Sequence, residues 1–173
     1  MKNKNNNFQT KIEPRRILFV GLSNKPGTPE LSVNTATGKV IREITEKLPG
    51  IDVHKTNATR HAPLDARGKL RYPTQSELES AFPILRRKIE KIRPAVIVSL
   101  GNIASRFLMD RLGIKKKGSG LNPVFIYQAH TNSTGLILLP IHHPSFVLIY
   151  RRTHLKNYVN NVAQTLRLLA NDN

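Results

Sequence analysis

Short apolar runs alternate along the chain with longer stretches in which apolar residues recur at helical spacing. The short runs predict four strands, at residues 15–21, 51–57, 95–100 and 136–141. Each run is followed by a predicted helix, at residues 38–48, 74–93, 101–108 and 155–169. Because strands that alternate with helices in this way form parallel sheets covered on both faces, the pattern predicts an α/β fold.

The predicted architecture has three α/β/α layers around a short, mainly parallel four-stranded sheet, and residues 124–127 are a candidate for one more strand. Residues 1–14 are polar and basic, which predicts a disordered basic arm ahead of a single domain at residues 15–173. A domain of this length can bury a hydrophobic core without disulfides or metal ions. We also expect a monomer.

Composition narrows the cellular setting and the chemistry. No apolar run is long enough to span a bilayer, and residues 1–9 are too polar for a signal peptide, so we expect a cytoplasmic protein without membrane partners. The chain has no cysteine. This excludes an iron–sulfur cluster, a thiolate zinc site and a cysteine nucleophile, and we expect no cofactor.

The charge of the chain points to a polyanionic partner. Lysine and arginine number 28 against 11 aspartates and glutamates, a formal net charge of +17. A field of this sign attracts nucleic acid, where phosphate neutralisation releases counterions. A basic surface that is only solvated would carry the same charge, so charge alone does not identify the partner.

Polar residues collect where the predicted strands end. The run at residues 136–141 stops at His142, His143, Pro144 and Ser145, and long loops follow the strands at 15–21 and 51–57. In a parallel sheet these loops leave from one edge, which is where ligands bind in open α/β folds. Loops as long as residues 22–37 are usually functional. The sequence therefore predicts a binding cleft at this edge.

Four motifs in order carry a resemblance to a known family: Phe19-Val20-Gly21 with Pro26-Gly27, Thr56-Asn57, the segment 93–101, and His143-Pro144-Ser145. Together they resemble the uracil-DNA glycosylase superfamily, in particular its bacterial iron–sulfur-containing branch, over about residues 17–169. The resemblance implies a short parallel sheet between helices. It also implies DNA as partner, either single- or double-stranded and containing uracil.

The resemblance implies roles for individual residues. His143 would stabilise the uracil anion as the glycosidic bond breaks, and Asn57 would read the pyrimidine edge through its amide donor and carbonyl acceptor. The branch carries a polar residue after the first-loop glycine to orient water, but Leu22 stands there. We therefore assign the water to Asn24, because Asn24-Lys25-Pro26-Gly27 resembles the Gly-x-Asn-Pro loop of another branch with one residue inserted.

The remaining candidates complete the predicted site. Val33 or Leu31 stands where the family has the aromatic residue that stacks on uracil. The predicted substrate-binding residues are Gly21, Leu22, Ser23, Val33, Asn57, Pro144 and Ser145. The predicted DNA-binding residues are Lys25, Arg60, Phe146, Arg151 and Arg152. The segment 146–152 offers an apolar tip and cations for flipping a nucleotide, although it also reads simply as the start of a helix.

The leading hypothesis is a DNA glycosylase of base excision repair that hydrolyses the N-glycosidic bond of uracil, or of a related damaged base, flipped out of DNA. The bond cleavage leaves an oxocarbenium-like sugar and an anionic base, so a fixed donor at the base oxygen acts mainly in the transition state. The rival is a catalytically inactive DNA-binding protein of the same fold, motivated by Leu22 and the missing aromatic residue. A glycosylase for another lesion, such as hypoxanthine, is a third possibility.

Several residues also have plain structural interpretations. His143 could be a capping histidine whose ring merely satisfies a loop carbonyl, and Asn57 could be only a turn residue. His142 and His143 are unlike a metal pair, because neighbouring strand residues point to opposite faces and no third ligand is near. The cluster cysteines of the resembled branch are replaced by His61 and, near the corresponding helix position, by Ala81.

Overall fold

The computed structural model describes residues 15–115, 121 and 124–171. Its strands form one five-stranded sheet in the order β2-β1-β3-β5-β4. Four of them run parallel, namely β1 (Arg16–Gly21), β2 (Asp52–Asn57), β3 (Val96–Leu100) and β5 (Ile137–Ile141). The predicted parallel four-stranded sheet is thus confirmed, and the two-residue strand β4 (His130–Thr131) adds an antiparallel edge beside β5.

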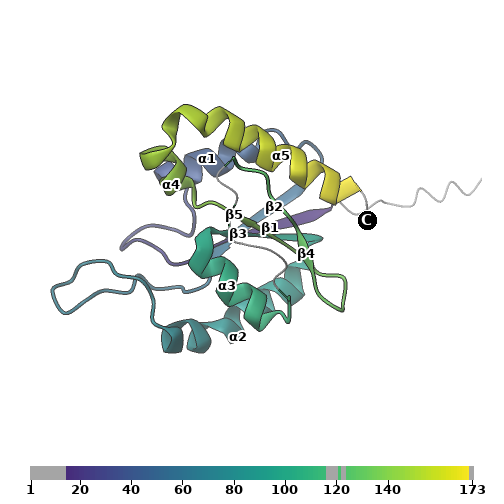
Figure 1. The fold of residues 1–173 in the computed structure, drawn as a ribbon. Helices are drawn as coiled ribbons and strands as arrows, with labels where there is room; N and C mark the ends of the chain where they lie inside the picture. Colours follow the sequence, from purple (N-terminus) through teal and green to yellow (C-terminus); the bar gives the residue numbers. More distant parts are fainter. Residues whose placement is uncertain (1–14, 116–120, 122–123, 172–173) are drawn as a thin grey trace, which may run out of the picture.

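Helices cover both faces of the sheet, so the predicted three layers are present (Figure 1). On one face lie α1 (Ala36–Thr45), α4 (Pro144–Tyr150), the short turn η1 (Arg152–His154) and α5 (Leu155–Asn171). On the other face lie α2 (Gln75–Ile92) and α3 (Gly101–Arg111). The loops after β1 and β2 extend to the left of the view, at the carboxyl edge of the sheet.

Successive strand residues build two separate cores. In β1, Phe19 packs into the core shared with α1, α4 and α5, while Leu18 packs into the core shared with α2 and α3. Both side chains are fully buried. The continuous apolar run therefore reflects burial on both faces, as expected for parallel strands between two helical layers.

Helix boundaries follow local chemistry. The capping box predicted at Thr74 and Glu77 is formed, with each side chain accepting from the other residue's backbone N–H. At the other end of α2, Arg93 adopts a left-handed conformation with φ of 50° and Pro94 prevents continuation. The helix after β1 begins at Ala36, two residues before the predicted start, because Thr35 caps it through Gly38.

The prediction of a strand at 124–127 is wrong. Phe125 has a φ of 59°, outside the β region, and both Phe125 and Tyr127 are buried against α5 instead of pairing in the sheet. The predicted basic arm at residues 1–14 lies outside the described residues. Among the described helices, none has the length and apolar character needed to cross a membrane.

Candidate active site at the carboxyl edge of the sheet

A cavity of about 690 Å³ opens at the carboxyl edge of the sheet, between the loop after β1, the loop after β2 and the start of α4. The structure brings seven of the predicted site residues to its wall: Leu22, Ser23, Asn24, Lys25, Asn57, His143 and Ser145. We call this space the edge cavity. Its volume is in the range of ordinary small-molecule pockets.

Asn57 lies at the floor of the edge cavity because β1 ends in glycine. Gly21 pairs with Asn57 in the sheet, and a methyl group on Gly21 would lie 2.2 Å from the Asn57 side-chain oxygen Oδ1. The carboxamide of Asn57 therefore occupies the space that any other residue at position 21 would fill. The backbone N–H of Ala58 donates to the Gly21 carbonyl at 2.8 Å and fixes the strand ends together.

The hydrogen-bonding capacity of Asn57 is only partly used. Its Nδ2 donates to Oδ1 of Asn24, whose own Nδ2 donates to the backbone carbonyl of Arg60 at 3.3 Å. The Oδ1 atom of Asn57 is buried and has no hydrogen-bond partner in the described part of the chain. A buried acceptor without a partner costs roughly 1–3 kcal/mol, so a ligand donor at this position would be favoured.

His143 is held in one orientation at the start of α4. It is the N-cap residue, and its Nδ1 lies 3.2 Å from the backbone N of Ser145 and 2.7 Å from the Ser145 hydroxyl. Since a backbone N–H can only donate, Nδ1 is the acceptor and the ring proton resides on Nε2. His143 therefore caps α4 by accepting at Nδ1 and not by satisfying a loop carbonyl, while Nε2–H remains a donor.

Burial and a nearby charge keep the His143 imidazole neutral, and a glycine lets it lie close to the start of α3. Burial lowers the pKa of His143 below its usual value, and the nearby charge of Lys25 lowers it further. Gly101, at the start of α3, has a φ of +83° and would place a Cβ only 3.2 Å from the Cβ of His143. The neutral form with a proton on Nε2 is thus the state present near neutral pH.

His142, the preceding residue, belongs to a different environment. Its Nδ1 lies 3.0 Å from the Tyr127 hydroxyl, its ring stacks on Phe146 at 5.6 Å, and its backbone carbonyl accepts from Tyr158. The two histidines therefore point into an aromatic cluster and into the edge cavity, respectively. Within the described residues, no group of three potential metal ligands is found.

The loop after β1 is anchored by an ion pair that the sequence did not suggest. Glu30 accepts from the Lys88 ammonium group of α2 at 2.9 and 3.0 Å, and the Thr56 hydroxyl lies within 3.1 Å of Glu30 and 2.7 Å of Lys88. Thr56 immediately precedes Asn57. Neither Glu30 nor any other carboxylate is found among the described residues that line the edge cavity.

Several predicted site residues lie elsewhere. Leu31 lines the edge cavity, but Val33 does not and is 43% exposed. Arg60 lies on a second cavity described below, and Arg151 lies with Phe125 and His154 around a third. The others that do not line the edge cavity are Gly21, Pro144, Phe146 and Arg152.

Nine residues on the wall of the edge cavity were not among the site residues named from the sequence: Thr28, Pro29, Thr35, Ala36, Thr37, Leu70, Arg71, Tyr72 and Ile149. Leu70, Arg71 and Tyr72 reach it from the loop after β2, and Ile149 reaches it from α4. Among the described residues that line the cavity, Tyr72 is the only phenylalanine, tyrosine or tryptophan. Ile149 lies in the segment 146–152, which the sequence offered either as an apolar tip for flipping a nucleotide or as the start of a helix. The loop residues have no periodicity that could have marked them.

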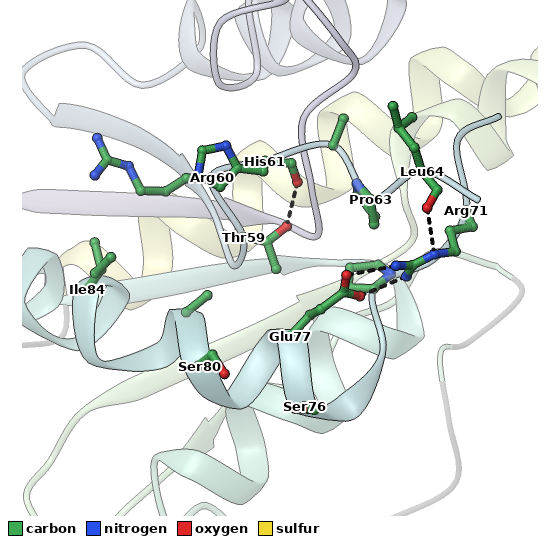
Figure 2. Close-up of a pocket in the computed structure, with 13 residues that line it drawn as sticks. Thr59, Arg60, His61, Pro63, Leu64, Arg71, Ser76, Glu77, Ser80 and Ile84 are labelled. Carbon is green, nitrogen blue, oxygen red and sulfur yellow. Dashed lines mark hydrogen bonds and ion pairs between the residues drawn. The ribbon is translucent and has the colours of Figure 1, made fainter. Parts of the chain in front are cut away.

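The second cavity, of about 480 Å³, lies between the loop after β2 and α2 (Figure 2). His61 and Ala81, the two positions at which the resembled branch has cluster cysteines, both line it. Arg71 spans its wall, donating to both carboxylate oxygens of Glu77 at 2.7 Å and to the Leu64 carbonyl at 3.1 Å (Figure 2). We call this space the loop–helix cavity.

The residues of the loop–helix cavity do not fit an iron–sulfur cluster. The chain contains no cysteine, and thiolates are the usual ligands of such clusters. The lining carboxylate, Glu77, is already committed to Arg71 and to the backbone N–H of Thr74. The ion pair joins the same two elements, the loop and α2, that a cluster bound at positions 61 and 81 would join.

Comparisons with known proteins show the family to which the chain is similar. The model of the Uracil DNA glycosylase superfamily matches residues 11–167. The chain is 30% identical over 142 residues to the type-4 uracil-DNA glycosylase of Archaeoglobus fulgidus, covering 79% of this chain and 68% of that protein. It is 26% identical over 140 residues to the type-4 uracil-DNA glycosylase of Saccharolobus solfataricus, covering 76% and 62%.

A more distant relative belongs to another type. The chain is 28% identical over 131 residues to the type-5 uracil-DNA glycosylase of Pyrobaculum aerophilum. The match covers 76% of this chain but 47% of that protein, so this chain spans about half to two thirds of the lengths of these relatives.

Proposed function

The chain belongs to the uracil-DNA glycosylase superfamily, and we propose that it hydrolyses the N-glycosidic bond of uracil, or of a related damaged base, flipped out of DNA. The observation that carries this proposal is the convergence of Asn57, His143 and Asn24 on one cavity. These side chains come from the ends of three separate segments. Together they provide a reader of the base edge, a donor for the leaving group and a polar group for water.

His143 is proposed to stabilise the departing base. As the C1′–N bond breaks, its electron pair moves onto the base, and negative charge grows on a carbonyl oxygen of the base. The Nε2–H of the neutral imidazole donates a hydrogen bond to that oxygen, which is worth most when the charge is fully developed. Ser145 fixes the orientation in advance through Nδ1, so little reorganisation is needed during the reaction.

Asn57 is proposed to select the base. Uracil presents an acceptor oxygen beside an N–H donor, and a carboxamide offers the complementary donor and acceptor. The unpaired Oδ1 of Asn57 can accept from that N–H after rotation of the carboxamide, and the second Nδ2 proton can serve the oxygen. Cytosine presents the opposite pattern and would leave buried groups unpaired.

Asn24 is proposed to place the attacking water. The oxygen of the water forms a bond to C1′ of the sugar. The proton that the water loses then neutralises the base anion, so the base leaves as a neutral molecule. Because no carboxylate lines the edge cavity, the water is oriented by hydrogen bonds and not deprotonated by a strong base. This is sufficient in principle when the sugar is already cationic, since an oxocarbenium-like centre is a powerful electrophile.

Base release from synthetic oligonucleotides tests the proposal directly. The substrates carry one uracil opposite guanine, opposite adenine or in single-stranded DNA, and alkali then cleaves at abasic sites. We expect uracil-dependent strand breakage that is lost in His143→Ala while DNA binding persists. Breakage at the wild-type rate in His143→Ala would contradict the role of His143.

A second candidate function is DNA or abasic-site binding without catalysis. It is favoured by Leu22, which replaces the polar residue of the resembled branch, and by the absence of a carboxylate from the cavity lining. Binding alone does not separate the two functions, since a chain with a net charge of +17 binds DNA in a salt-dependent way under both. Tight binding to uracil-containing DNA without base release from any of a panel of damaged bases would favour this second function.

A further inference from the structure

The loop after β2 contains a small hairpin at residues 63–71. Leu64 and Leu70 pair as an antiparallel bridge, and the Arg71 backbone N–H donates to the Pro63 carbonyl at 2.9 Å. At the tip, the Asp65 side chain accepts from the backbone N–H groups of Arg67 and Lys69 at 2.9 and 2.8 Å. The hairpin is therefore held by its own hydrogen bonds.

The hairpin presents apolar side chains and cations to solvent. Leu64, Leu70 and Tyr72 are 42%, 47% and 72% exposed. Arg67 and Lys69 are exposed at the tip, where the single carboxylate, Asp65, is used by the turn. Exposed aromatic surface beside positive charge is the combination with which proteins bind unpaired nucleotides, the bases stacking on rings and the backbone lying on cations.

Tyr72 stands at the foot of this hairpin and on the wall of the edge cavity, the same cavity that holds Asn57 and His143. Its backbone carbonyl accepts from Arg71 at 2.9 Å, and the same guanidinium is bound bidentately to Glu77 of α2. The backbone at Tyr72 is thus fixed to α2, while its ring is left open to a ligand.

We propose that Tyr72 stacks on the nucleobase that enters the edge cavity, and that hairpin 63–71 is a DNA-contacting arm opposite α4. The inference rests on the proposed function for the identity of the ligand. It assigns the stacking ring to the loop after β2, whereas the loop after β1 carries the aliphatic Leu31 at the cavity wall. Ile149 of α4, 70% exposed, also lines this cavity.

The test uses the full chain and its variants Tyr72→Leu and Tyr72→Phe. Two oligonucleotides are bound at fixed salt, one carrying 2′-fluoro-deoxyuridine, which resists cleavage, and the other a tetrahydrofuran abasic analogue at the same position. We expect Tyr72→Leu to weaken binding of the first by about fivefold to 100-fold, the range for loss of one base–aromatic stack. Tyr72→Phe keeps the ring and stays near wild type. Neither variant weakens binding to the abasic DNA, because no base is there to stack.

Leu168→Ala is the matched control, since Leu168 is also an exposed apolar residue, at 57%, but lies on α5. Thermal unfolding should be unchanged in all variants, which separates stacking from folding. Equal binding of the 2′-fluoro-deoxyuridine DNA by wild type and Tyr72→Leu overturns the inference, as does an equal loss on both DNAs. If the wild type never releases uracil but the base-dependent loss occurs, the proposed catalysis fails while the stacking role stands.

Discussion

The two cavities lined by the loop after β2 differ in how far their polar side chains are already paired with other groups of the chain. The edge cavity holds polar groups that are oriented but not fully used, namely the Nε2–H of His143 and the Oδ1 of Asn57. In the loop–helix cavity, Arg71 and Glu77 satisfy each other's charge in a bidentate pair. One cavity is arranged to meet a ligand and the other to hold two elements together.

The edge cavity is thus the proposed place for chemistry, and the loop–helix cavity is part of the supporting structure. The Arg71–Glu77 ion pair and its hydrogen bonds hold the loop after β2 to α2 at the place where a cluster bound at positions 61 and 81 would join them. The chain is long enough for its two cores to supply the remaining stability. The loss of the cysteines is therefore no argument against the proposed activity.

The largest difference between the two cavities is expected when the histidine of each is replaced by alanine. His143→Ala removes the donor to the developing anion and should slow single-turnover uracil release by about 10²–10³-fold, the usual cost of one such donor. His61→Ala, on the wall of the loop–helix cavity, is the matched control and should release uracil at the wild-type rate. If both variants lose activity equally, the two cavities are not functionally distinct.

A smaller but still large effect is expected for Gly21→Ala. The added methyl group would lie 2.2 Å from Oδ1 of Asn57 and 3.1 Å from Leu31, so the carboxamide has to leave its place. Such overpacking costs about 1–3 kcal/mol of folding stability. Urea unfolding measures this cost, and release of uracil should fall further than stability explains. A variant with wild-type uracil release would show that the position of Asn57 is not required.

The features of the fold and of the site that could be predicted from the sequence are those that depend on residues close together in the chain. Strand ends place Asn57 and His143 at one edge, because parallel strands finish together, and the capping residues Thr74 and Glu77 are only three apart. The strand at 124–127 was predicted wrongly, since its apolar residues are buried against a helix and not in the sheet.

The unpredicted parts depend on contacts between distant residues. Glu30 and Lys88 are 58 positions apart and show no shared pattern. Of the two candidates Val33 and Leu31, it is Leu31 that reaches the edge cavity, after a backbone turn with a φ of 45° that periodicity does not encode. Tyr72 comes to the same cavity only because the hairpin folds back on itself.

Acid unfolding should reveal the mechanical role of the loop–helix cavity. The side-chain hydrogen bond from Arg71, followed by the backbone N–H of Thr74, lowers the pKa of Glu77 from 4.5 to about 2. A lowered carboxylate pKa contributes stability above the unfolded value, and this contribution is lost as the pH falls from about 4.5 to about 2. Glu77→Gln should therefore unfold at lower urea than wild type near pH 7, with the gap closing toward pH 2.

Glu90→Gln provides the control for that measurement, because Glu90 is also on α2 but pairs only with Arg86 along the exposed helix. Surface pairs of this kind contribute little. Its unfolding midpoint should follow wild type at every pH. A gap between wild type and Glu77→Gln that does not change with pH would show that the ion pair is not the source of the stability difference.

The smallest expected effect concerns the charge beside His143. Lys25 lowers the pKa of His143 in addition to burial, and the proposed reaction needs the neutral ring. In wild type, the acid limb of kcat/KM should therefore lie below pH 6.5, because the neutral form persists until the pH falls through a lowered pKa. Lys25→Gln removes a nearby positive charge, raises that pKa and moves the limb to higher pH.

Lys91→Gln, exposed near the end of α2, should leave the limb in place. The position of the limb, and not the absolute rate, is the readout, since Lys25 also lines the edge cavity and its loss can weaken DNA binding at every pH. An acid limb that stays fixed in Lys25→Gln would mean that the titrating group is not His143 in the edge cavity.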